Sequence, residues 1–254
     1  MKIAFAGKGG VGKTTLAALF IRALSKDAEA VLAVDCDPVA NLGRLIGIKD
    51  ADKIVPIVEM KELINERTGA SPDRSFYQLN PKVDDIPDKF SKNKDNVKLI
   101  VMGTVKAGGS GCMCPESTFL KALLNKLLLS KDEAVVMDME AGIEHLGRAT
   151  ANSVGHLLVV VEPSLGSMNA AKKISRLAAE IGIKDISVIL NKMKNKKEMD
   201  FVRDGISPLS LIGSVPFDEK IAEFETGKKI DMEGTSAYSA VLEIKNKVVK
   251  TMEV

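Results

Sequence analysis

The segment Gly7–Thr14 carries glycines and lysines at the spacing of a phosphate-binding loop. Its residues, Gly7-Lys8-Gly9-Gly10-Val11-Gly12-Lys13-Thr14, match the pattern GxxxxGK(S/T) between an apolar segment and an apolar stripe at helical spacing. Glycines let backbone N–H groups close on phosphate oxygens at the positive end of a helix dipole. We therefore expect the loop to bind ATP or ADP, with Lys13 reaching the β- and γ-phosphates and Thr14 ligating Mg²⁺. The nucleotide-binding residues predicted from the loop are Gly9, Gly10, Val11, Gly12, Lys13, Thr14 and Thr15.

Two apolar segments end in acidic residues that could act beside a bound nucleotide. Val31–Asp35 is followed by a second acid, Asp37, and Ala134–Met137 leads into Asp138. Carboxylates at the carboxyl ends of parallel strands lie where α/β proteins bind ligands. An acid after a second apolar strand holds Mg²⁺ through water in phosphate-loop enzymes, so we expect this role for Asp138. In a purely structural alternative, Asp37 caps a helix and Asp35 forms a salt bridge.

A glycine-rich segment, Lys106–Glu116, carries two thiols one residue apart, Cys112 and Cys114, just before a predicted helix. A helix N-terminus lowers the pKa of a thiol and favours the thiolate, which is the form that binds metals. Two thiolates are too few for a metal that takes four ligands, whereas two chains together supply a Cys₄ set suited to zinc, nickel or an iron–sulfur cluster. The alternatives are a redox pair or two inert thiols. The third cysteine, Cys36, is predicted to be buried, since strand alternation turns it away from the neighbouring acids.

The composition is that of a globular protein without a strong overall charge. The chain has 254 residues, 45% of them hydrophobic, with 36 Lys and Arg against 34 Asp and Glu. This near balance argues against nucleic acid as a partner. No segment reaches the roughly 18 apolar residues of a membrane span, and the first residues lack the apolar stretch of a signal peptide. We expect a cytoplasmic protein, in which cysteines are thiols or metal ligands rather than disulfides.

Short apolar segments rich in β-branched residues alternate with longer helical patterns, which is typical of parallel strands joined by crossover helices. Strands are predicted near residues 2–6, 30–35, 97–102, 133–138, 156–161, 185–190 and 209–214. We expect one domain, 1–254, with the α/β architecture of a phosphate-loop NTPase: a single doubly wound, mostly parallel sheet of seven or eight strands flanked by helices. The polar, proline-containing segment 71–96 is predicted to be a surface excursion.

The lysine at position 8 is not required by the basic phosphate-loop pattern. With it, Lys8–Thr15 resembles the deviant Walker A loop of a family that includes the cell-division ATPase MinD, the partition ATPase ParA and the nitrogenase iron protein. In that family the early lysine crosses a nucleotide-sandwich dimer to touch the phosphates of the other chain. The resemblance therefore implies ATP hydrolysis by a homodimer, with Lys8 acting across the interface and Lys13 within one chain.

Two further segments resemble the nucleotide-sensing switches of this family. The Asp-Cys-Asp-Pro sequence before Asn41 resembles the first switch, which implies that Asp37 positions or activates the attacking water and that Asn41 lies near Mg²⁺. Met139–Gly142 resembles the second switch, a turn that senses the γ-phosphate. Glu140 departs from the small or proline residue that is common there, and it is either a surface charge or a residue with a chemical role.

The adenine-binding positions of the family also have counterparts. Asn191 stands at the end of an apolar segment where a family asparagine reads adenine, and Pro216 begins a Pro-x-Asp segment that lies near the base. A turn-forming role is the alternative for Asn191. The motifs fall in the family's order over residues 2–218, so the resemblance spans most of the chain.

The pair Cys112-Met113-Cys114 resembles that of the CooC-type ATPases, which help to insert nickel into carbon monoxide dehydrogenase. The nitrogenase iron protein instead takes one cysteine from a comparable loop and one after the second switch, where this chain has Ile143-Glu144-His145. The chain is thus identified as a member of the CooC-type ATPases, with apo carbon monoxide dehydrogenase as client and nickel or zinc shared between two chains. His145 is a candidate weak further ligand, and His156, which starts an apolar segment, is assigned a structural role.

Two other function classes remain open in the sequence. An iron–sulfur electron donor or cluster carrier, similar to the nitrogenase iron protein or the Mrp scaffold proteins, would use the same thiols. A MinD-like membrane-organising ATPase would use the apolar stripe within Tyr238–Met252 as an amphipathic anchor. Glu243 interrupts the basic face of that stripe and no aromatic anchor follows, so packing in the core is preferred and no stable membrane association is expected.

Overall fold

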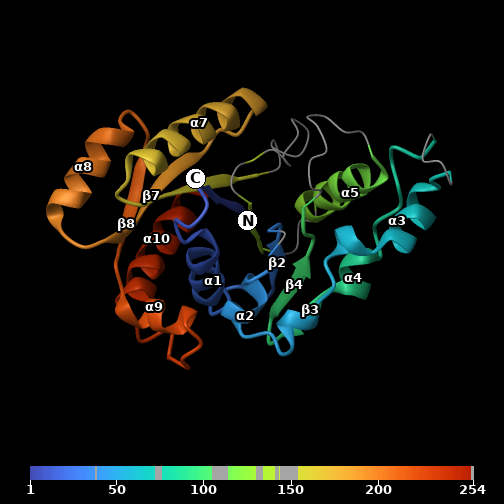
Figure 1. Ribbon diagram of the computed structural model, residues 1–254, viewed down its shortest axis with the longest axis horizontal. Coiled ribbons are helices and arrows are strands. Elements are labelled where there is room, and N and C mark those ends of the chain that lie inside the picture. The colour runs from blue at the N-terminus through green and yellow to red at the C-terminus, as the bar shows by residue number, and fades with distance from the viewer. Residues whose placement is uncertain are drawn as a thin grey trace.

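The computed structural model describes residues 1–37, 39–71, 76–104, 114–129, 134–140, 143 and 154–252. Within them, eight strands form one sheet in the order β3-β4-β2-β5-β1-β6-β7-β8. The strands are β1 Lys2–Gly7, β2 Val31–Asp35, β3 Lys92–Lys94, β4 Val97–Val101, β5 Ala134–Asp138, β6 His156–Val161, β7 Ile186–Met193 and β8 Leu211–Pro216. Neighbouring strands are parallel, except that β3 is antiparallel to β4. The expected mostly parallel sheet is confirmed (Figure 1).

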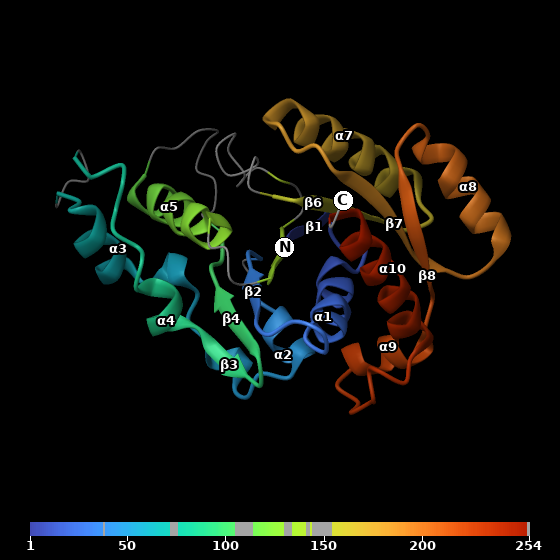
Figure 2. The same ribbon diagram turned by 180° about the vertical axis from the view of Figure 1, so that it is seen from behind.

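Helices cover both faces of the sheet, as Figures 1 and 2 show. They are α1 Lys13–Leu24, α2 Leu42–Ile46, α3 Lys61–Thr68, α4 Ile86–Phe90, α5 Pro115–Leu129, α7 Leu165–Ile181, α8 Lys196–Ile206, α9 Glu219–Glu225 and α10 Ser236–Met252, with short 3₁₀ turns at Ala51–Lys53 and Ile57–Glu59. Side chains of α1, α2 and α10 pack on one face, and side chains of α5, α7 and α8 pack on the other. In β1, Ile3 and Phe5 face the first set while Ala4 and Ala6 face the second. Burial on both faces explains why the strands read as continuous apolar runs.

The segment 71–96 is only in part the surface excursion that its polar sequence predicts, since Phe76 and Leu79 are exposed whereas later residues enter the core and the sheet. Val83 and Ile86 are buried in the core beneath α5. β3 forms the edge of the sheet, where it pairs with β4. β3 was missed because its sequence, Lys92-Asn93-Lys94, is polar. An edge strand with charged side chains is a common form, since charge there prevents pairing with another sheet edge.

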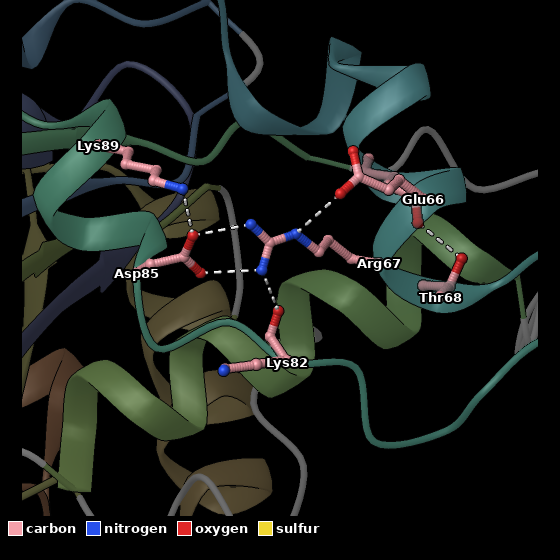
Figure 3. Close-up of polar contacts among 7 residues, drawn as sticks. Glu66, Arg67, Thr68, Lys82, Asp85 and Lys89 are labelled. Carbon is pink, nitrogen blue, oxygen red and sulfur yellow. Dashed lines mark hydrogen bonds and ion pairs between the residues drawn. The ribbon is translucent and has the colours of Figure 1, made fainter.

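A cluster of charged side chains attaches α3 to the chain just before α4 (Figure 3). The Arg67 guanidinium donates to both carboxylate oxygens of Asp85, at 2.9 and 2.7 Å, and also to the carbonyl of Lys82. Lys89 reaches the same carboxylate at 2.8 Å. These two cations hold the pKa of Asp85 well below its usual range. The bidentate geometry makes this one of the more specific polar contacts outside the sheet.

The C-terminal helix α10 packs in the core, which is the role that the sequence favoured over that of a membrane anchor. Its apolar stripe, which includes Val241, Ile244 and Val248, is buried against α1 and β8. A Cβ on Gly213 of β8 would lie 2.6 Å from Ile244, so the helix approaches the strand closely where the strand has no side chain. The stripe is therefore unavailable as a MinD-like anchor. Among the described residues, none of the helices is both long enough and apolar enough to cross a membrane.

Candidate functional site

The glycine loop lies at the point where the chain winds in opposite directions across the sheet. β1 is flanked by β5 and β6, and the helices that follow β1 and β6, which are α1 and α7, pack on opposite faces. In open α/β sheets such a point opens a crevice at the carboxyl ends of the strands, where ligands bind. The strand pattern therefore places the loop where a nucleotide would be expected.

Gly12 shows why this loop requires glycine. It stands just before the first turn of α1 with φ of 91°, in the left-handed region. A Cβ there would also lie 2.5 Å from the amide nitrogen of Asn191. Both the backbone conformation and the close approach exclude a side chain.

A cavity of about 500 Å³ opens above this loop. Its lining combines the loop with the first acidic switch and with Glu140, and consists of Gly9, Gly10, Gly12, Lys13, Thr14, Thr15, Asp37, Asn41, Arg44, Leu45, Glu140 and Lys192. Lys13 is buried, and its ammonium donates to the carbonyl of Lys8 at 3.3 Å. Most of the predicted loop residues thus share one cavity, whereas Val11 is fully buried beneath it.

Asp138 ends β5 as a fully buried carboxylate that fits a cation site. Among the described residues, neither of its oxygens has a hydrogen-bond partner. Burial raises the pKa of Asp138 to about 7, a rise to which Asp35 adds, while the nearby Thr14 hydroxyl and Lys13 ammonium oppose it. An unpartnered buried carboxylate beside a threonine hydroxyl has the oxygen chemistry that Mg²⁺ prefers. The residues present therefore fit the expected metal.

Asp35 and Asp37 have different roles at the end of β2. Asp35 is fully buried, and its two oxygens accept the backbone N–H groups of Asp37 and Leu42, each at 3.0 Å. Burial raises the pKa of Asp35 to about 6, although these two hydrogen bonds lower it. The Asp37 carboxylate accepts from the N–H of Val39 at 2.8 Å and lines the cavity. Among the described residues the structural alternative does not hold, because Asn41 rather than Asp37 is the N-cap of α2 and Asp35 accepts backbone N–H groups rather than a basic side chain.

A second cavity, of about 190 Å³, adjoins the first one and is more apolar. The two share Gly12, Thr15 and Lys192, and the second is lined in addition by Leu16, Leu19, Asn191, Pro216, Phe217, Asp218, Ile221, Ala222 and Ala237. Asn191 and Pro216 thus lie where a base would be expected beside the phosphate cavity. The Asn191 amide nitrogen donates to the carbonyl of Val11 at 2.8 Å, so it also contacts the loop itself.

Two cavity residues, Lys192 and Arg44, were not singled out from the sequence. Lys192 donates to the carbonyl of Gly10 at 2.6 Å and pairs with Glu162 at 3.2 Å. Arg44 lines the phosphate cavity and lies over the ring of Phe224, 5.3 Å from its centroid. The sequence signals for these two residues were their positions: Lys192 directly follows Asn191, and Arg44 lies three positions after Asn41.

The cysteine pair is described only in part. Cys112 lies outside the described residues, as do His145 and Gly142. Cys114 is half-buried directly before α5, where its sulfur accepts the N–H of Ser117 at 3.4 Å. Within the described ranges, no group of three His, Cys, Asp or Glu side chains could hold a metal. Cys36 is buried as predicted, and burial raises the pKa of its thiol.

The remaining predicted residues lie apart from the two cavities. Lys8 is exposed, and its ammonium lies against the start of α7, 3.2 Å from where Gly166 would carry a Cβ. His156 is buried, with its Nε2 3.0 Å from the hydroxyl of Ser187. Burial lowers the pKa of His156, which agrees with the structural role expected for it.

Known proteins resemble this chain over nearly its whole length. The CobQ/CobB/MinD/ParA nucleotide binding domain matches residues 2–230. The carbon monoxide dehydrogenase accessory protein CooC of Rhodospirillum rubrum is 43% identical over 94% of this chain and 89% of its own length. An uncharacterised ATP-binding protein of Methanocaldococcus jannaschii is 42% identical over 97% of this chain and 99% of its own length.

Solved structures with lower identity share the fold. MinD in the MinC:MinD complex of Aquifex aeolicus superposes with a TM-score of 0.68 at 22% identity, over 98% of this chain and 95% of its own. A ParA family ATPase from Chlorobium tepidum gives 0.64 at 19% identity, over 99% and 98%. The loop geometry, the buried acids and these relatives agree. The chain therefore belongs to the CobQ/CobB/MinD/ParA nucleotide-binding domain family, as a CooC-type member, and it is an ATPase.

Proposed function

We propose that this ATPase acts as a homodimer in the maturation of carbon monoxide dehydrogenase, carrying a metal ion between the Cys112 and Cys114 thiolates of two chains. Nickel is the favoured cargo, and zinc is accepted by the same ligands. The observation that carries the proposal is the 43% identity to a carbon monoxide dehydrogenase accessory protein over 94% of the chain. The place of Cys114 supports it, because a helix that follows a parallel strand starts at the carboxyl edge of the sheet, the edge that carries the glycine loop.

The surroundings of Cys114 suit a metal-binding thiolate. Its sulfur accepts the N–H of Ser117, and its carbonyl accepts the N–H of Thr118 at 3.1 Å, so the residue caps α5. A thiolate at that position is stabilised by a backbone donor and by the positive end of the helix dipole. One such thiol cannot complete a metal site. A second copy of the chain would supply the missing ligands.

We infer roles for four predicted residues of the nucleotide site. Lys13 would bind the β- and γ-phosphates, while Thr14 and Asp138 would hold Mg²⁺, Asp138 through water. When bound, Mg²⁺ would neutralise charge on the phosphate oxygens. The positive charge beside Asp138 would keep that carboxylate ionised. Asp37 would orient the attacking water, a role for which its position on the cavity wall is suitable.

Closure of the dimer would couple the binding of ATP to the binding of the metal. Lys8 would leave its place over α7 and bind the phosphates of the other chain, as the family resemblance implies. Closure would bring the two cysteine loops together, so ATP and metal would each favour the closed dimer. Hydrolysis would remove the γ-phosphate contact and release the metal to the apo-enzyme.

The decisive experiment measures metal content and mass together. We expect the wild-type chain, with Ni²⁺ and a non-hydrolysable ATP analogue, to form dimers holding about one ion per two chains. Cys112→Ser with Cys114→Ser should lose the ion, and Lys8→Ala should bind ATP but dimerise weakly. Cys36→Ala is the matched control, because this cysteine is buried in the core. The loaded dimer, and not the cysteine variant, should activate apo carbon monoxide dehydrogenase when ATP is present.

Three outcomes would overturn the proposal. One is an ion held by each monomer, and another is unchanged metal content in the cysteine variant. A brown protein with the broad visible absorption of an iron–sulfur cluster would instead indicate the cluster carrier.

A further inference from the structure

Lys192, which is not part of the glycine loop, contacts that loop and has an unusual backbone conformation. It is part of β7, yet its φ is 61°, in the left-handed region that few non-glycine residues adopt. Its ammonium donates to the carbonyl of Gly10 at 2.6 Å and lies 3.2 Å from a carboxylate oxygen of Glu162. Such outliers persist only where the surrounding structure fixes them, and they gather at functional sites.

The contact with Gly10 controls the direction of a neighbouring N–H group. The carbonyl of Gly10 and the N–H of Val11 belong to one trans peptide unit, and in such a unit they point in opposite directions. Fixing that carbonyl on the Lys192 ammonium therefore also fixes the N–H of Val11, directed away from the lysine. Asn191 does the same for the next peptide, because it holds the carbonyl of Val11 at 2.8 Å and thereby orients the N–H of Gly12.

Glu162 anchors the lysine in turn. It follows the last residue of β6, the strand that pairs with β7. Its own N–H donates to the hydroxyl of Ser167 at 3.1 Å, in the first turn of α7. The backbone of Glu162 is thus fixed between a strand and a helix of the core, and its carboxylate reaches Lys192 from there. A chain of contacts runs from α7 through Glu162 and Lys192 to Gly10.

We propose that Lys192, oriented by Glu162, is a positioning residue that sets the phosphate loop in its nucleotide-binding conformation before ATP or ADP arrives. Its ammonium acts on the Gly10 carbonyl and not on the nucleotide. An N–H group that is aimed in advance at a phosphate oxygen does not need to be ordered on binding, so affinity rises. The inference concerns nucleotide binding alone, and it stands whether or not the chain carries a metal.

The test is the affinity of the full chain for ADP and for a non-hydrolysable ATP analogue, measured by calorimetry. Lys192→Met should weaken binding about threefold to tenfold, the range for one partly exposed charge-assisted hydrogen bond. Lys192→Gly should weaken it to the same extent, because glycine adopts the positive φ without strain and, like methionine, lacks the ammonium. Lys197→Met, which removes an exposed lysine of α8, is the charge-matched control and should bind as the wild type does.

Glu162→Gln separates positioning from direct attraction to phosphate. If Lys192 acts through Gly10, loss of the Glu162 charge leaves the lysine less well oriented and weakens binding about twofold to threefold. The double variant, Glu162→Gln with Lys192→Met, should then bind nucleotide no more weakly than Lys192→Met alone. If Lys192 instead attracted phosphate directly, removing a neighbouring negative charge would tighten binding, and that result would overturn the inference.

A stability measurement excludes a merely structural role. The melting temperature without nucleotide should be equal in the wild type and in Glu162→Gln, while the rise on adding ADP should be smaller in the variant. Unchanged affinity in both Lys192→Met and Glu162→Gln would refute the proposal. So would a loss of affinity that is matched by Lys197→Met.

Discussion

Replacing Asp138 by asparagine tests whether β5 ends in a buried carboxylate that destabilises the nucleotide-free protein. The pKa of this acid rises from 3.8 to about 7 in the folded chain, mainly because it is buried. A raised pKa in an acid means that the folded state binds the proton more tightly than the unfolded state does. The stabilisation from that proton is complete below pH 3.8 and is lost as the pH rises toward 7.

The size of the effect follows from the shift. Between these two pH values the wild type should lose about 1.4 kcal/mol of unfolding free energy per pH unit relative to Asp138→Asn, which has no proton to lose. Over the whole window the difference reaches about 4 kcal/mol, as an upper limit. The buried amide adds its own unsatisfied donors, but that contribution does not depend on pH. The pH slope of the difference is therefore the quantity to measure.

Urea unfolding with EDTA and without nucleotide, at half-unit steps from pH 4 to pH 8, gives the slope. Asp204→Asn, which replaces an exposed acid of α8, should show a flat difference from the wild type. With saturating Mg²⁺ and ADP the order should reverse, because the wild-type carboxylate then faces a cation. An unfolding free energy of Asp138→Asn that stays at a constant distance from that of the wild type, or a wild type that gains stability relative to the variant as the pH rises, would refute the burial argument.

Two further variants test contacts described above. Asp35→Asn leaves only one side-chain oxygen to accept the N–H groups of Asp37 and Leu42. We therefore expect ATP to bind nearly as in the wild type but kcat to fall about tenfold, equivalent to about 1.4 kcal/mol. An equal kcat in steady-state assays would contradict the role of this carboxylate in holding the segment 37–42. Arg67→Ala removes the stronger of the two cations that lower the pKa of Asp85. A carboxylate with a lowered pKa stabilises the fold at a pH above the usual pKa of an aspartate, and this stabilisation is lost as the pH falls below that value. In urea unfolding, Arg67→Ala should therefore lose more stability at pH 7 than at pH 3. An equal loss at both pH values would contradict this reasoning.

The sequence allowed the sheet to be predicted because its strands are buried on both faces. Segments such as Val31–Asp35 and Ala134–Asp138 are apolar up to the acid that ends each of them, and each proved to be a strand. The polar edge strand Lys92–Lys94 has no such signal. The stripe within Tyr238–Met252 fits either a membrane or a core, and only its packing against α1 and β8 decides between them.

The phosphate loop could be predicted from local spacing, whereas its supports could not. Gly7 to Thr14 are adjacent in the chain, so a pattern reveals them. Lys192 is 182 residues from Gly10, and its contact depends on the order of strands in the sheet. The unpaired state of Asp138 is likewise a property of its surroundings, which alternation along one strand does not reveal.

The position of Cys114, directly before the first turn of α5, makes this residue suitable for spectroscopic labelling. Cys36 is 3% exposed with a raised thiol pKa, so thiol reagents should attack it slowly. In Cys112→Ser, a nitroxide would therefore attach at Cys114. Phe119 and Leu123 of α5 are fully buried, so the base of the spin label would move with the core of the protein. In the proposed homodimer, electron-spin distances between the two labels would then report rigid-body rotation of the chains during the ATP cycle.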